Sequence, residues 1–302
     1  MVDIADLNKR HGIAGKVTFR EGAEGFAVMD VSNSHATASI ALQGAHLMTW
    51  APRNEQPVIW LSSAAKLATG KSIRGGVPVC WPWFGPHPSE ASFPAHGFAR
   101  TVPWEVAETK ALDDDRTLAV LRLIQTPATR AQWQHPCDLE CRITVGESLE
   151  IDLVTRNTGT APFTIGAALH TYFAVNDIRH TAIRGLENCA YLDKVDGGKR
   201  KQQTGPVTFS GETDRIYLDS AADILIDDPQ LKRRIRIAKR GSRSTVVWNP
   251  WIEKANKMGD LGENGYLNMV CVETANAADD VVTIKPGAEH HLWTEYSVEA
   301  LG

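Results

Sequence analysis

The chain has 302 residues, of which 43% are hydrophobic and 23% are charged, and its net charge is −4. This composition is ordinary for a globular protein, and the near-balanced charge gives no reason to expect nucleic acid or an anionic membrane as a partner. No run approaches the roughly 20 apolar residues of a membrane-spanning helix, and the first residues lack the apolar centre of a secretion signal. We therefore expect a cytoplasmic protein.

The cysteines point to the same compartment. There are five, an odd number, and no two form a C-x-x-C pair, so neither a disulfide framework nor a zinc knuckle is indicated. Cys137 and Cys141 lie in one predicted strand, where their Cα atoms would be roughly 13 Å apart, too far for a disulfide. A reducing environment is the simplest interpretation. Nothing in the sequence demands more than a monomer.

Alternation of apolar and polar residues is the dominant pattern along the chain. It is clearest in Cys137–Val145 and Leu149–Leu153, which are separated by the predicted hairpin turn Gly146-Glu147. Other predicted strands are, in chain order, Gly25–Val31, Thr37–Leu42, Val58–Leu61, Thr117–Ile124, Thr164–Leu169, Ile224–Ile226, Ile235–Ala238, Thr245–Trp248, Met269–Glu273, Val281–Ile284 and His291–Val298. So many short strands favour an all-β fold, a large antiparallel β-sandwich.

Helical signals are few. Short helices are predicted only at Ser62–Leu67 and Ile252–Met258. No glycine-rich phosphate loop follows a strand, which argues against a nucleotide-binding α/β domain. With no linker or break in composition, we expect residues 1–302 to form a single domain.

Two segments combine arginine with glycine, proline and aromatic residues. The first is RGGVPVCWPWFG, residues 74–85, and the second is PAHGFAR, residues 94–100. The aromatic side chains are more often core residues than sugar-binding surfaces. Arg74 and Arg100 could face one cavity and bind phosphate oxygens, although isolated arginines usually form surface ion pairs.

Three further segments carry ionisable side chains next to apolar strands. His170 lies in LHTYF, where a single histidine is more often structural than catalytic. Asp214 lies in TDRIY, where it could bind sugar hydroxyls or cap a turn. Glu273 ends the apolar run MVCVE, where a carboxylate must be either paired or functional, because burying it alone costs several kcal/mol.

Taken together and in this order, RGGVPVCWPWFG, HGFAR, LHTYF, TDRIY, VVWNPW and MVCVETAN resemble the D-hexose-6-phosphate mutarotases, also called glucose-6-phosphate 1-epimerases. These enzymes are a branch of the aldose 1-epimerase, or galactose mutarotase-like, superfamily. The resemblance covers about residues 25–300 and implies a β-supersandwich that needs neither metal nor organic cofactor.

The resemblance also implies roles for individual residues. It places the catalytic pair on His170 and Glu273, and a substrate-binding aspartate on Asp214. Arg74 and Arg100 match the arginines that line the sugar-phosphate pocket. His96 is expected to face the sugar. Some relatives have a substrate-contacting glutamine before the HGF motif, where this chain has Ala95, so the preferred hexose stays open.

Opening a sugar ring needs one base and one acid, and a carboxylate with an imidazole can supply them. From ordinary pKa values of about 4.3 for Glu and 6.5 for His, Glu273 is expected to be ionised and His170 to carry the proton. Two alternatives remain: an epimerase for unphosphorylated aldoses, and a sugar-phosphate-binding protein without catalysis. A glycoside hydrolase is less favoured, because the sequence offers no evident second carboxylate to pair with Glu273.

Overall fold

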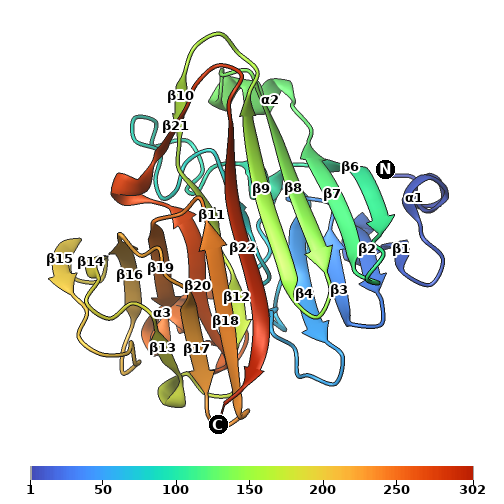
Figure 1. Ribbon diagram of the computed structural model, residues 1–302. Coiled ribbons are helices and arrows are strands. Elements are labelled where there is room, and N and C mark those ends of the chain that lie inside the picture. Colours follow the sequence, from blue (N-terminus) through green and yellow to red (C-terminus); the bar gives the residue numbers. More distant parts are fainter. Residues whose placement is uncertain (1, 302) are drawn as a thin grey trace.

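The computed structural model describes residues 2–301, and every pairing between strands in that range is antiparallel (Figure 1). Eight strands form one long sheet. Their order is β13 (Ala182–Arg184), β17 (Ile224–Asp228), β18 (Arg233–Arg240), β22 (Glu289–Ala300), β9 (Leu149–Asn157), β8 (Cys137–Val145), β7 (Thr117–Leu123) and β6 (Trp104–Ala111).

Two further sheets pack against this long sheet, with β3 against β8 and β20 against β22. The four-stranded sheet has the order β1 (Val17–Glu21), β2 (Ala27–Ser32), β3 (Ala36–Ala41) and β4 (His46–Pro52). The other has the order β15 (Lys199–Gln202), β14 (Ala190–Asp193), β16 (Thr213–Leu218), β19 (Ser244–Asn249), β20 (Met269–Asn276), β11 (Ala167–Leu169) and β5 (Val79–Cys80), with β12 (Tyr172–Ala174) also on β20. A continuous apolar core fills the space between the layers.

The remaining elements are short. A two-stranded ribbon joins β10 (Phe163–Ile165) to β21 (Val282–Ile284). The α-helices are α1 (Ile4–His11), α2 (Pro127–Gln132) and α3 (Trp251–Met258), and the 3₁₀ turns are Ala23–Gly25, Ala99–Thr101, Ile178–His180, Gly265–Asn268 and Ala278–Asp280. None of the helices within residues 2–301 is long and apolar enough to cross a membrane.

The predicted all-β sandwich is confirmed, with corrections to individual elements. The alternating segment Cys137–Val145 is β8, with the predicted bounds, and α3 contains the predicted helix. Val58–Leu61 is not a strand, because it makes only single bridges at Ile59 and Leu61, and Ser62–Leu67 is not helical. Whether residues 1–302 form a single domain stays a prediction.

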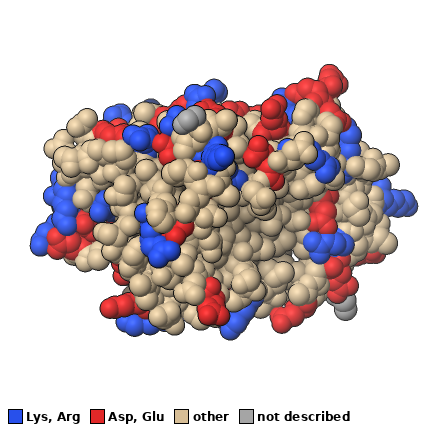
Figure 2. All heavy atoms as spheres, turned by 90° about the horizontal axis from the view of Figure 1, so that it is seen from below, with Lys and Arg blue, Asp and Glu red and all other residues tan. Residues whose placement is uncertain are grey.

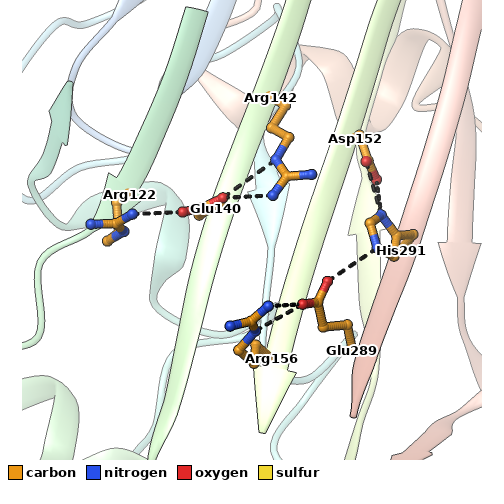
Figure 3. A network of polar contacts seen from close by, with 7 residues as sticks. All are labelled: Arg122, Glu140, Arg142, Asp152, Arg156, Glu289 and His291. Carbon is orange, nitrogen blue, oxygen red and sulfur yellow. Dashed lines mark hydrogen bonds and ion pairs between the residues drawn. The ribbon is translucent and has the colours of Figure 1, made fainter. Parts of the chain in front are cut away.

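The outer face of the long sheet carries a network of ion pairs (Figure 3). Glu140 on β8 accepts from Arg122 at 2.7 Å and Arg142 at 2.9 Å, and His291 on β22 lies 2.9 Å from Asp152. Surface pairs of this kind contribute about 0–1 kcal/mol each. On the face seen in Figure 2, acidic and basic side chains are likewise interspersed, without a large patch of one sign. We interpret these charged side chains as a solvated surface rather than as a binding site.

Candidate active site

A cavity of about 430 Å³ brings together all six site residues that the sequence singled out. They come from segments far apart in the chain. Arg74 precedes β5, and His96 lies in the loop before the 3₁₀ turn Ala99–Thr101, which contains Arg100. His170 lies between β11 and β12, Asp214 is on β16 and Glu273 is on β20. The structure thus establishes their proximity, while their roles remain proposals.

His170 is held in place by its backbone and by aromatic neighbours. Its N–H donates to the carbonyl of Pro78 at 3.0 Å, which fixes the turn between β11 and β12. The imidazole stacks on Tyr172 with ring centroids 5.1 Å apart, and it packs in an edge-to-face arrangement with His96 and Trp248, whose ring centroids lie 6.0 and 6.2 Å away. These contacts restrict the ring to one orientation at the cavity wall.

Glu273 lies opposite His170. Its side chain is 1% exposed, and its Oε1 is 3.3 Å from Nε2 of His170. Within the described residues, Oε2 of Glu273 and Nδ1 of His170 are buried without a hydrogen-bond partner. Buried polar atoms left unpaired each cost about 1–3 kcal/mol, so two of them beside one cavity indicate a place where a polar ligand supplies the missing partners.

Burial shifts the pKa values of this pair in opposite directions. It raises the pKa of Glu273 well above 4.5, an effect that Asp214 adds to and Arg100 opposes. It lowers the pKa of His170 well below 6.5, and the neighbouring His96 and Arg100 lower it further. Desolvation disfavours both charged forms. The expectation of an ionised Glu273 and a protonated His170 therefore needs correction, because burial favours the proton on Glu273.

His96 is a neutral hydrogen-bond donor. The N–H of Gly85 donates to its Nδ1 at 3.3 Å, so in the neutral ring the proton lies on Nε2. Burial, reinforced by Arg100, lowers the pKa of His96 to about 4. The next residue, Gly97, has a φ of 71°, and a Cβ there would lie 1.9 Å from the carbonyl oxygen of Trp81. Only glycine fits this close approach, which sets the direction of His96.

The two arginines are held differently. The Nε of Arg74 donates to Asp260 at 3.0 Å, and its Nη1 donates to the hydroxyl of Tyr172 at 3.0 Å. Arg100 donates only to the carbonyl of Ala95, also at 3.0 Å, and makes no ion pair among residues 2–301. Arg74 is therefore oriented and partly neutralised, whereas Arg100 keeps an uncompensated charge in the cavity.

Asp214 provides a second carboxylate, which sequence reasoning had not paired with Glu273. Burial raises its pKa, while Lys254 and Lys194 oppose that effect. Both lysines line the cavity, as do Tyr172 and Trp248. The two aromatic residues lie inside the LHTYF and VVWNPW motifs, so the motifs could have indicated them. Nothing in the sequence around Lys194 or Lys254 indicates that these lysines line the cavity.

A cavity of about 460 Å³ over β18 and β22 is of similar size, but it is lined by surface ion-pair residues such as Asp223 and Arg236 and by no histidine. In the range 2–301 no group of three or more His, Cys, Asp or Glu side chains could hold a metal ion. Another cavity of about 310 Å³, beside α2, is lined by Trp81, Trp133 and His135 but contains no acid–base pair like that of His170 and Glu273. The cavity that contains His170 and Glu273 is therefore the candidate active site.

Comparison with known proteins agrees with this geometry. The family model for aldose 1-epimerase matches residues 28–297. The chain belongs to the aldose 1-epimerase family. Within it, the chain is 40% identical over 261 residues to an Escherichia coli (strain K12) protein named "Putative glucose-6-phosphate 1-epimerase", with 86% of each chain covered. A protein of the same name from Cenchrus ciliaris is 36% identical over 261 residues, covering 83% of this chain and 78% of its own.

A solved structure also supports membership of this family. The mutarotase-like protein YeaD from Salmonella typhimurium, described as "a putative mutarotase", superposes with a TM-score of 0.89 at 35% identity, covering 96% of each chain. The resemblance expected from the sequence motifs is thus confirmed at the level of the family, the fold and the class of enzyme, an epimerase.

Proposed function

We propose that this epimerase interconverts the α and β anomers of glucose 6-phosphate, as a hexose-6-phosphate mutarotase. The observation that carries the proposal is the buried pair of His170 and Glu273, 3.3 Å apart, in a cavity that also holds the uncompensated Arg100. The names of the relatives support the choice of substrate. A cytoplasmic location and a monomeric state remain predictions.

The reaction needs two proton transfers. A base takes the proton of the C1 hydroxyl, whose O–H electrons form the carbonyl. The bond from C1 to the ring oxygen breaks, and that oxygen takes a proton from an acid. Rotation of the aldehyde and the reverse steps then close the ring on its other face.

One proton shared by His170 and Glu273 is sufficient for this cycle. In each direction one member gives a proton and the other receives one, and ring closure restores the starting state. The opposed pKa shifts keep the pair singly protonated over a wide pH range, because the raised pKa of Glu273 disfavours loss of its proton and the lowered pKa of His170 disfavours uptake of a second one. General acid and base catalysis each contribute about 10²–10⁴-fold.

The other residues hold the substrate. We assign the phosphate to Arg100 and Arg74, since guanidinium groups offer planar forks of donors to phosphate oxygens. The Nε2–H of His96 and the carboxylate of Asp214 suit sugar hydroxyls. Fixing both ends of the sugar places C1 against the proton-transfer pair.

The phosphate assignment is tested with Arg100→Ala. Charge-assisted hydrogen bonds contribute about 1.5–3 kcal/mol, so KM for glucose 6-phosphate should rise roughly 10- to 100-fold while KM for glucose changes little. Equal effects on both sugars would instead favour an epimerase for unphosphorylated aldoses. Binding of glucose 6-phosphate by the wild-type protein without acceleration of anomer exchange would favour a sugar-phosphate-binding protein.

A further inference from the structure

Four cationic side chains line the cavity, and they differ in how much of their charge is already used. They are Arg74, Arg100, Lys194 and Lys254. Arg74 is paired with Asp260 at 3.0 Å, and Lys254 on α3 is paired with Glu212 at 2.7 Å. Arg100 and Lys194 have no such partner within the described part of the chain. Two positive charges without an ion-pair partner among these residues therefore line the cavity.

The backbone of Lys194 is held rigidly at the cavity wall. Lys194 directly follows β14, and its N–H donates to the carbonyl oxygen of Asp214 on the neighbouring strand at 2.8 Å. The preceding Asp193 closes the turn, because its side chain accepts from the N–H of Val195 at 3.1 Å and its carbonyl accepts from Gly198 at 2.7 Å. The position of Lys194 is thus fixed, while its side chain is exposed and able to move.

The acidic residues of the same hairpin are occupied by other lysines. Asp193 pairs with Lys201 at 2.8 Å, and Asp196 pairs with both Lys199 and Lys201 at 2.9 Å. These pairs leave Lys194 as the lysine of this hairpin that lines the cavity and makes no ion pair within residues 2–301. The other two lysines of the hairpin pair with its acidic residues, whereas Lys194 has no ion-pair partner among the described residues and lies beside the cavity. This arrangement indicates that an incoming anion becomes the partner of Lys194.

We propose that Lys194 is a specificity-determining residue that, together with Arg100 in the same cavity, contacts the 6-phosphate of the substrate. The inference rests on the proposed function. A phosphate monoester carries about −1.5 to −2 charges at neutral pH, and because Asp260 already partly neutralises Arg74, Arg100 would balance only one of them. Lys194 supplies the second positive charge, so the two residues together distinguish a sugar phosphate from the free sugar.

A lysine suits this task in a particular way. Its ammonium is a point charge on a flexible four-carbon stem, which can follow the phosphate as the sugar opens and closes, whereas a guanidinium fork is geometrically more restrictive. Because the side chain is exposed and loses conformational freedom on binding, its contribution should be smaller than that of Arg100. We expect about a tenfold effect on binding.

The test compares Lys194→Gln with Lys199→Gln, a matched control that removes the same charge from the same hairpin but does not line the cavity. Anomer exchange is measured with glucose 6-phosphate and with glucose, and binding of inorganic phosphate is measured by calorimetry. Lys194→Gln should raise KM for glucose 6-phosphate and the Kd for phosphate about tenfold, with little change for glucose. Lys194→Arg should recover most of the loss.

Two results would overturn the inference: Lys194→Gln behaving like Lys199→Gln, or Lys194→Gln weakening glucose and glucose 6-phosphate equally. Neither bears on the proposed function, which is judged on the wild-type protein alone. If the wild-type protein failed to accelerate anomer exchange, the proposed function would be lost, and the phosphate Kd of the two glutamine variants would still decide the role of Lys194.

Discussion

Replacing Glu273 by Gln separates a catalytic role of this residue from a role in stability. The amide keeps the size of the side chain, which is 1% exposed, but it can neither give nor accept a proton within the pair. Loss of one acid–base group lowers rates about 10²–10⁴-fold, equivalent to about 2.7–5.4 kcal/mol in activation free energy. We therefore expect kcat for anomer exchange of glucose 6-phosphate to fall by that factor.

The same substitution should not destabilise the fold. Because burial raises the pKa of Glu273 in the folded state, its carboxyl favours folding at low pH, and that advantage is lost as pH rises from about 4.5 through the raised pKa. Each pKa unit corresponds to about 1.4 kcal/mol. Glu273→Gln removes this cost, so its Tm near neutral pH should equal or exceed that of the wild type.

The assay combines NMR exchange rates between the anomers with thermal unfolding at several pH values. Retention of kcat within tenfold of the wild type would remove Glu273 from the proton transfers. A loss of activity accompanied by a matching loss of Tm would show that Glu273 acts through the fold instead.

Three further predictions concern Arg74, His170 and Gly97. Arg74→Lys should raise KM for glucose 6-phosphate about tenfold, because one ammonium cannot keep both 3.0 Å contacts of the guanidinium; an unchanged KM would refute a role for that geometry. The acid limb of kcat should lie below pH 6.5, since burial lowers the pKa of His170, and a half-maximal kcat at or above pH 6.5 would contradict this. Gly97→Ala should lower Tm by at least about 5 °C, because its Cβ would meet the Trp81 carbonyl at 1.9 Å. Gly205→Ala, with a similar φ of 68° but open space around it, is the control, and equal losses would show that the clash is unimportant.

Strand alternation and short motifs predicted the elements and site residues that depend only on neighbouring positions in the sequence. Alternation identified β8 because its buried residues follow one another at every second position. The apolar run Val58–Leu61 also has residues typical of a strand, but it pairs with no strand along its length and makes only isolated bridges. The ordered motifs located His170 and Glu273 because each lies inside one of them.

Contacts between residues far apart in the sequence, and the burial of individual side chains, could not be predicted from neighbouring residues. Asp260 meets Arg74 across 186 residues of sequence, and nothing near either residue signals the pairing. Lys194 joins the cavity only because β14 pairs with β16. The reversal of the expected proton positions on Glu273 and His170 follows from desolvation, which a sequence does not show.

We propose that the pair formed by His170 and Glu273 opens and closes a sugar-phosphate ring. Magnetisation transfer between the anomeric protons of glucose 6-phosphate, recorded with catalytic amounts of the wild-type protein, is the decisive test of this role. Exchange should lie well above the uncatalysed rate, and His170→Ala should return it to nearly that rate. Binding of glucose 6-phosphate with no increase in exchange would exclude this role for the pair.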